Sequence, residues 1–207
     1  MPMHEKKLVI MGFGGHARSV ADVALACGYM ELLFVDANAA PNENFLGHPV
    51  KHHLQGLDET WRDAIAASGN NQQRRIQYQH IAQLGMRPVS IISPLASVGT
   101  GSVISPGCFV GHHAHIGPMA SIGHACIINT GAIVEHEARV GDYSHVSVNS
   151  TLAGRCSLGS FSMLGAGVTV IDGLSVADEV IIGAGAVVID SISQSGTYVG
   201  VPAYRVP

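Results

Sequence analysis

An aliphatic side chain recurs at every sixth position from residue 92 to residue 188 without one insertion. The positions are Ile92, Val98, Ile104, Val110, Ile116, Ile122, Ile128, Val134, Val140, Val146, Leu152, Leu158, Leu164, Val170, Val176, Ile182 and Val188. Because helices repeat every ~3.6 residues and flat strands every ~2, a period of six requires short strands separated by sharp corners. A small residue usually follows four positions later and fits the interior of such a strand. The period predicts a hexapeptide β-solenoid.

The number of repeats in a coil follows from a resemblance. In the acyltransferases whose repeat this one resembles, three hexapeptides close one triangular coil, and the solenoid is left-handed, an exception to the usual right-handed crossover. Residues eighteen apart should then lie one above the other, about 4.8 Å apart. We therefore expect an all-β left-handed parallel β-helix with a C-terminal cap over residues 92–207.

The abrupt start of the period near Ile92 indicates a separate domain over residues 1–91. A net charge of −4 with 13% charged residues leaves no basic patch for nucleic acid. The polar segment 1–7 lacks the apolar region and cleavage site of a signal peptide, and no run of about eighteen apolar residues could span a membrane. We expect a soluble cytoplasmic protein without a nucleic-acid or membrane partner.

The first domain begins with a βαβ pattern. A buried strand over residues 8–11 runs into the turn Gly12-Phe13-Gly14-Gly15-His16, a helix to about Cys27 and a second strand over 32–35 that ends at Asp36. The turn fits the glycine-rich nucleotide-binding fingerprint, with an acidic residue about twenty positions later. Because helix N-termini bind phosphate, Gly12, Gly14, Gly15 and His16 are candidate nucleotide ligands. The alternative is a purely structural tight turn.

A third strand is expected at 64–67, followed by the loop Gly69-Asn70-Asn71, a helix, and a last strand at 88–92. Loops after successive parallel strands converge at one edge of a sheet, so the glycine turn, Asp36 and the 69–71 loop should line one crevice. About four strands make only half of a Rossmann fold, which favours a single nucleotide over a dinucleotide cofactor. A nucleotide attached to a substrate is the expected ligand.

The segment Glu135-His136-Glu137 is the best candidate for chemistry. Its neighbours Val134 and Ala138 point inward in repeat register, so His136 should face outward near a corner with a carboxylate on each side. A carboxylate can fix the imidazole tautomer and stabilise the imidazolium, which suits a general base. Gly154, eighteen residues on, should lie directly above His136 and leave its N–H free for an acyl carbonyl or its oxyanion.

The other solenoid histidines are weaker candidates. His145 lies half a coil beyond His136, and the remaining ones are interpreted as solvated turn residues. Zinc binds at subunit interfaces of one hexapeptide family, the γ-class carbonic anhydrases, but here His112, His124 and His136 are twelve apart and fall on three different faces. The H-x4-H spacing of those anhydrases is missing from the repeat, so we expect no metal.

Several motifs occur together in one order. They are Gly12–His16, Gly69–Asn71, Asn129-Thr130, Glu135–Glu137, Ser144–Ser147, Ala153-Gly154 and Gly200–Ala203. In this order they resemble bacterial sugar O- and N-acetyltransferases, most closely the UDP-4-amino-sugar N-acetyltransferase of bacillosamine synthesis, over nearly the whole chain. The resemblance implies a homotrimer with intersubunit active sites, acetyl-CoA between adjacent solenoids, and the sugar nucleotide on the N-terminal domain.

The resemblance also implies residue roles. His136 is the base and Glu137 its partner. The implied contacts to acetyl-CoA or its acetyl group are Asn129, His145, Gly154 and Ala184. The chain departs from the family at Ala184, where related sequences often carry Gly, and at Ala37 after Asp36, where the bacillosamine enzyme has a second acid.

We therefore expect an acetyl-CoA-dependent N-acetyltransferase that acts on the 4-amino group of a UDP-linked deoxysugar by direct transfer in a ternary complex. The alternatives are a sialic-acid-type O-acetyltransferase or a transferase for another nucleotide amino sugar, such as a dTDP- or GDP-linked one. Alternatives of another class are a non-catalytic nucleotide-sugar-binding scaffold and a nicotinamide-dependent enzyme that uses the Gly12 turn.

Overall fold

The computed structural model describes residues 6–54 and 56–207, so most of the polar N-terminal segment, residues 1–5, lies outside the described residues. The N-terminal part is a six-stranded sheet of order β3-β4-β2-β1-β5-β6, packed with two helices. Its elements are β1 (Lys6–Met11), α1 (Gly15–Ala26), β2 (Tyr29–Val35), β3 (Asn44–Phe45), β4 (His48–Lys51), β5 (Asp63–Ala66), α2 (Asn71–Gln83) and β6 (Arg87–Pro88). The parallel β1–α1–β2 unit confirms the expected half-Rossmann pattern.

Two features of this sheet differ from the sequence-based expectation. The strand expected at 88–92 is two strands, because Val89 N donates to Ala64 O in the N-terminal sheet while Ile91 N already donates to Cys108 O in the solenoid. The β3–β4 hairpin was not predicted. Leu46 and Gly47 adopt positive φ angles of 51° and 84° at its tip, the conformation that tight hairpins need, but Leu gives no sequence signal for it.

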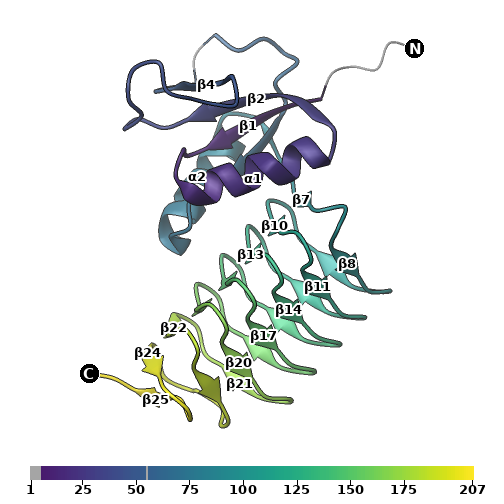
Figure 1. The fold of residues 1–207 in the computed structure, drawn as a ribbon, viewed down its shortest axis with the longest axis vertical. Coiled ribbons are helices and arrows are strands. Elements are labelled where there is room, and N and C mark those ends of the chain that lie inside the picture. The colour runs from purple at the N-terminus through teal and green to yellow at the C-terminus, as the bar shows by residue number, and fades with distance from the viewer. Residues whose placement is uncertain (1–5, 55) are drawn as a thin grey trace.

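The rest of the chain is a solenoid of three sheets (Figure 1). The first sheet holds β7 (Ile91–Ile92), β10 (Phe109–Val110), β13 (Ile127–Ile128), β16 (His145–Val146), β19 (Met163–Leu164), β22 (Val180–Ile182), β24 (Gly196–Val199) and β25 (Tyr204–Arg205). The second holds β8 (Ser97–Val98), β11 (His115–Ile116), β14 (Ile133–Val134), β17 (Thr151–Leu152), β20 (Thr169–Val170) and β23 (Val187–Val188). The third holds β9 (Val103–Ile104), β12 (Ser121–Ile122), β15 (Arg139–Val140), β18 (Ser157–Leu158) and β21 (Ser175–Val176).

The register of the coils matches the predicted period. Val110 pairs with Ile128, Val134 with Leu152, and Val140 with Leu158, each eighteen residues apart and parallel. From Val110 onward, the large residues of the repeat and the small apolar ones four positions later form one continuous buried cluster, whereas Val98 in the first coil is exposed. The predicted β-helix is confirmed, and the exact period explains why its interior could be predicted position by position.

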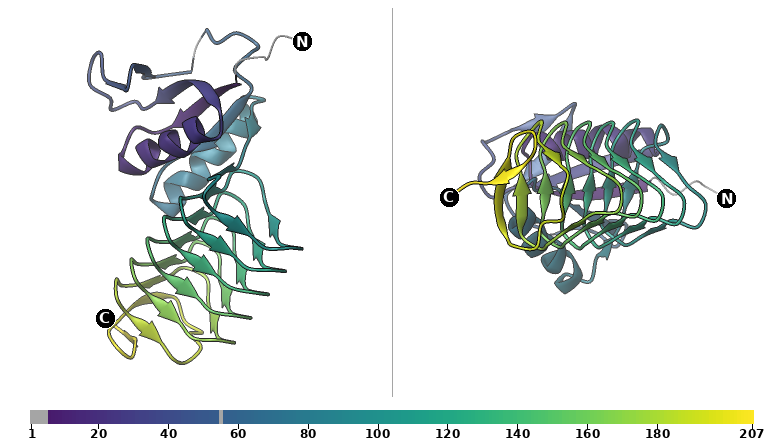
Figure 2. Two further views of the ribbon diagram at one scale, coloured as in Figure 1. Left: turned by 45° about the vertical axis from the view of Figure 1, so that its right-hand side comes forward. Right: turned by 90° about the horizontal axis from the view of Figure 1, so that it is seen from below.

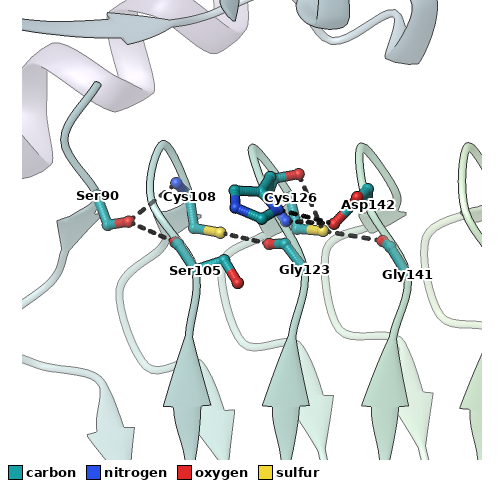
Figure 3. Close-up of polar contacts among 8 residues, drawn as sticks. Ser90, Ser105, Cys108, Gly123, Cys126, Gly141 and Asp142 are labelled. Atoms are coloured by element: carbon teal, nitrogen blue, oxygen red, sulfur yellow. Dashed lines mark hydrogen bonds and ion pairs between the residues drawn. The ribbon is translucent and has the colours of Figure 1, made fainter. Parts of the chain in front are cut away.

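The cysteines of the repeat lie inside the solenoid as small buried residues. All four cysteines are free, and the thiols of Cys108 and Cys126 donate to the carbonyls of Gly123 and Gly141 in the next coil (Figure 3). Burial raises the pKa of the Cys126 thiol well above its usual value. These thiols are protonated hydrogen-bond donors within the stack.

The two parts of the chain pack against each other through both helices (Figure 2). Side chains of α1 and of the N-terminal sheet share one apolar cluster with Phe109 and Ile127 of the first solenoid sheet. Arg74 of α2 is buried and donates to the carbonyls of Ala125 at 2.7 Å and Tyr143 at 2.6 Å. Burial lowers its pKa to about 10, so the guanidinium stays charged and fixes α2 against the solenoid.

Candidate functional site

The three loops that were expected to converge do so around a crevice of about 1030 Å³. Gly12, Gly14, Gly15 and His16 line it from the first turn, together with Asp36 after β2 and Gly69 after β5. The next two residues of the 69–71 loop have other contacts. Asn70 caps α2 by accepting from Gln73 N, and the Asn71 amide donates to the carbonyls of Phe161 and Ser162 in the solenoid.

Asp36 shapes the glycine turn. Its two carboxylate oxygens accept from Phe13 N at 3.0 Å and from Asn38 N at 2.9 Å, so the side chain joins the first turn to the loop after β2. Gly12 has a φ of +113° and donates its N–H to Val35 O, a conformation that favours glycine. Helix α1 then begins with no side-chain cap and no acidic residue in its first turn. Its free N–H groups suit a phosphate.

Uncharged groups dominate the crevice walls. No Lys or Arg is among the described residues that line it, and its ionisable groups are Asp36, His16, His52, His53 and His80. On α2, Ile76 and Leu84 are 52% and 44% exposed and form an apolar wall. A ligand with a flat apolar part and a phosphate would match this distribution.

His16, which is half-buried, and His145, which is buried, lie at the junction of the crevice and the first solenoid sheet. The rings of His16 and His145 are 6.4 Å apart, and Nε2 of His145 lies 3.3 Å from the Asn129 amide nitrogen. Burial, with the charge of Arg74, lowers the pKa of His16 to about 3 and that of His145 to about 4. Among the described residues, Nε2 of His16 and Nδ1 of His145 have no hydrogen-bond partner. Each neutral imidazole therefore keeps one buried ring nitrogen without a protein partner.

His136 occupies a different place, the corner between β14 and β15 that joins the second and third sheets. Gly154 lies against it as the coil register predicts, because a Cβ on Gly154 would overlap Nε2 and Cε1 of the imidazole. Arg155 N donates to His136 O at 2.9 Å, which ties the two coils together. Within the described residues, the Gly154 N–H donates no hydrogen bond. Imidazole and free amide therefore stand side by side, as an acyl-transfer site requires.

The two carboxylates beside His136 do not hold its ring. Glu135 Oε2 accepts from the backbone N–H of His136 at 3.0 Å. Glu137 is exposed, adopts the left-handed φ of 59°, and lines a shallow depression over the third sheet with Arg139 and Arg155. In the part of the chain that the structure describes, neither carboxylate is hydrogen-bonded to the imidazole.

The candidate residues thus form two groups on opposite sides of the triangular solenoid. His145, Asn129 and Ala184 belong to the first sheet and to the corner that follows it, and the N-terminal crevice is packed on the same sheet. His136 and Gly154 lie at the corner opposite that sheet. Figure 1 shows the N-terminal domain on the side of the coils where β7, β10 and β13 are labelled, with β8, β11 and β14 farther from it. One chain alone does not bring the two groups together.

Neither a cluster of potential metal ligands nor a membrane-spanning helix occurs among the described residues. In residues 6–54 and 56–207, no group of three or more His, Cys, Asp or Glu side chains is arranged to hold a metal ion. Neither α1 nor α2 is long and apolar enough to cross a bilayer.

Comparisons with known proteins find the same two-part fold, an N-terminal domain followed by a β-solenoid. Residues 7–81 match the PglD N-terminal domain family, and residues 86–199 match the GMPPB C-terminal domain family. The acetyltransferase domain of PglB from Neisseria gonorrhoeae FA1090, in complex with acetyl coenzyme A, is 30% identical, with a TM-score of 0.92 over 98% of this chain and 100% of that chain. The chain belongs to the hexapeptide-repeat sugar acetyltransferase family.

A second solved structure adds a nucleotide sugar to the comparison. A variant of perosamine N-acetyltransferase from Caulobacter crescentus, with Asn in place of one His, was solved in complex with CoA and GDP-perosamine. It is 32% identical to this sugar acetyltransferase, with a TM-score of 0.88 over 97% of each chain. WeeI from Acinetobacter baumannii AYE is 16% identical with a TM-score of 0.68, and shares the fold.

Proposed function

We propose that this protein transfers the acetyl group of acetyl-CoA to the 4-amino group of a UDP-linked deoxysugar, with His136 as general base. The observation that carries the proposal is the contact between the His136 imidazole and Gly154, whose N–H is free beside it. The crevice at the glycine turn supplies the nucleotide site. The Neisseria domain in complex with acetyl coenzyme A supports the acyl donor.

The active site lies between two copies of the chain in a homotrimer. In one chain His136 is at the corner opposite the sheet that carries His145 and the nucleotide crevice, so a sugar held in the crevice needs the His136 corner of a neighbour. Cyclic assembly would repeat that pairing at every interface. We assign residues 1–91 to nucleotide-sugar binding and residues 92–207 to acetyl transfer and assembly.

The transfer is direct. The amine nitrogen attacks the thioester carbonyl, and the Gly154 N–H donates to the oxygen as it becomes negative. His136 takes one proton from the nitrogen, the C–S bond breaks, and the protonated imidazole returns this proton to the departing thiolate. His145 and His16, which are neutral, donate or accept hydrogen bonds to the acetyl group or sugar. Holding both substrates in one complex supplies much of the acceleration.

A GDP-linked amino sugar is the second candidate acceptor. It is favoured by the Caulobacter enzyme, which binds GDP-perosamine and is as similar to this chain as the Neisseria domain is. The single acid at Asp36, followed by Ala37, is the position where the two candidates would be distinguished.

The test is thiol release from acetyl-CoA by the purified protein with a UDP-4-amino-4-deoxysugar, and in parallel with its GDP-linked counterpart. The proposal expects release that depends on the UDP acceptor and is lost with His136→Ala. Faster release with the GDP sugar would support the second candidate. If UDP binds but neither amine causes release, the acetyltransfer proposal is wrong for these acceptors.

A further inference from the structure

A carboxylate faces His136 across the space above Gly154. Asp172 stands two coils beyond His136 at the same corner, and its Oδ1 is 2.7 Å from the point where a Cβ on Gly154 would lie. Nε2 of His136 is at least as close to that point. Imidazole, carboxylate and the free Gly154 N–H therefore surround one small space that only glycine leaves open.

The separation of the two side chains can be bounded. Both atoms lie within 2.7 Å of the same point, so they are at most about 5.4 Å apart by geometry. His136 and Asp172, both within the described residues, form no ion pair, so every nitrogen–oxygen distance between them exceeds 4.0 Å. One nitrogen atom, placed ~2.8 Å from each of the two groups, would fit between them.

Arg155 fixes the carboxylate in this position. Its guanidinium donates to Oδ2 of Asp172, which leaves Oδ1 turned toward the space above Gly154. Other corner aspartates accept from the backbone: Oδ1 of Asp142 accepts from His124 N at 2.7 Å, and Oδ1 of Asp178 accepts from Ser160 N at 2.7 Å. Asp172 accepts no such bond from Gly154 N among the described residues. It remains an acceptor for a ligand.

Resting on the proposed function, we propose that Asp172 is a specificity residue that selects an amine over a hydroxyl as the acetyl acceptor. In the tetrahedral intermediate an attacking nitrogen carries two protons. His136 removes one, and Asp172 accepts a hydrogen bond from the other, which stays on the amide product. A hydroxyl has only one proton, so its oxygen would face the Asp172 carboxylate with lone pairs alone. A desolvated carboxylate without a donor is unfavourable.

The experiment compares two acceptors that differ in one group, a UDP-4-amino-4-deoxysugar and the same sugar with a 4-hydroxyl. In Asp172→Asn we expect kcat/KM for the amine to fall about tenfold or more, because a charge-assisted hydrogen bond is lost. The rate for the hydroxyl should stay the same or rise, and the KM for acetyl-CoA should be unchanged. Asp172→Glu should keep part of the preference. Asp178→Asn is the matched control, since Asp178 holds the same repeat position at a different corner.

Equal loss with both acceptors in Asp172→Asn would show a structural role and overturn the proposal, as would an unchanged rate with the amine. If His136→Ala is inactive while Asp172→Asn matches the wild type, the proposed function stands and only the role of Asp172 is wrong. If the wild type itself prefers the hydroxyl, both are wrong.

Discussion

The histidines on the two sides of the solenoid have different surroundings. His16, half-buried, and His145, buried, lie at the first sheet, and desolvation and Arg74 lower their pKa values to about 3 and about 4. His136 is partly exposed at the opposite corner, beside a glycine with a free N–H. The first pair can only orient a ligand at neutral pH, whereas the second environment admits a base. This difference supports our proposal that each side holds half of a site.

The largest change in activity is expected when the proposed base, His136, is replaced. His136→Ala should lower kcat by ~10²-fold or more, the usual contribution of a general base, and leave the trimer intact. The matched control is His124→Ala, which removes a histidine from the same repeat position at another corner. Thiol release and light scattering measure the two effects. A His136→Ala variant as fast as the wild type would remove the basis for the two-sided site.

Gly154→Ala should cause the next largest fall in kcat. The Gly154 φ is not in the left-handed region, so the backbone accepts alanine, but the Cβ would overlap the His136 imidazole and the Asp172 carboxylate. We expect the ring to be displaced and kcat to fall by ~30-fold, within the range for misplaced catalytic groups. Steady-state kinetics would measure the fall in kcat, and thermal unfolding would check that the variant is folded. A normal kcat would mean that this space is not where the reaction takes place.

A smaller effect is expected on the crevice side. Asp36→Ala removes the acceptor for Phe13 N and Asn38 N and frees the glycine turn, so UDP should bind ~10-fold more weakly, the cost of about one charge-assisted hydrogen bond. Titration calorimetry would measure UDP and acetyl-CoA separately. Acetyl-CoA affinity should not change, and equal weakening of both ligands would argue against separate sites.

The His16 and His145 pair acts on folding rather than on the reaction, and its effect is visible as pH dependence of stability. The folded protein keeps His16 and His145 neutral down to about pH 3 and about pH 4, whereas the unfolded chain binds protons below about pH 6.5. The two histidines therefore leave stability unchanged above about pH 6.5, and stability falls below that pH because only the unfolded chain gains protons, by up to about 1.4 kcal/mol per pH unit for each histidine.

Urea unfolding between pH 7 and pH 4 would measure this slope. His16→Gln and His145→Gln should each flatten it. If neither variant changes the slope, the two histidines are not held neutral in the folded protein.

The two domains of the molecule are unequally predictable from the sequence. In the solenoid the uninterrupted period, with the three hexapeptides per coil that the resemblance implies, is enough to place Gly154 directly against His136. In the first domain the turn at Gly12 and the acid at Asp36 carry recognisable signals, but the β3–β4 hairpin does not. Arg74 was missed, because no pattern distinguishes an arginine that is buried against carbonyls of a distant coil from an exposed one. Glu137, which the resemblance pairs with His136, adopts a left-handed φ at its corner and lines a depression over the third sheet.

The central claim, that one active site combines two chains, is tested most directly by mixing two inactive variants. Gly14→Asp should prevent phosphate binding by charge alone, since Gly14 caps α1 and nothing lies within 4 Å of its Cβ position. His136→Ala removes the base. Trimers co-refolded from equal amounts would each contain at most one complete site, so we predict roughly a quarter of the wild-type activity where each variant alone has almost none. A mixture as inactive as its components would contradict a site shared between subunits.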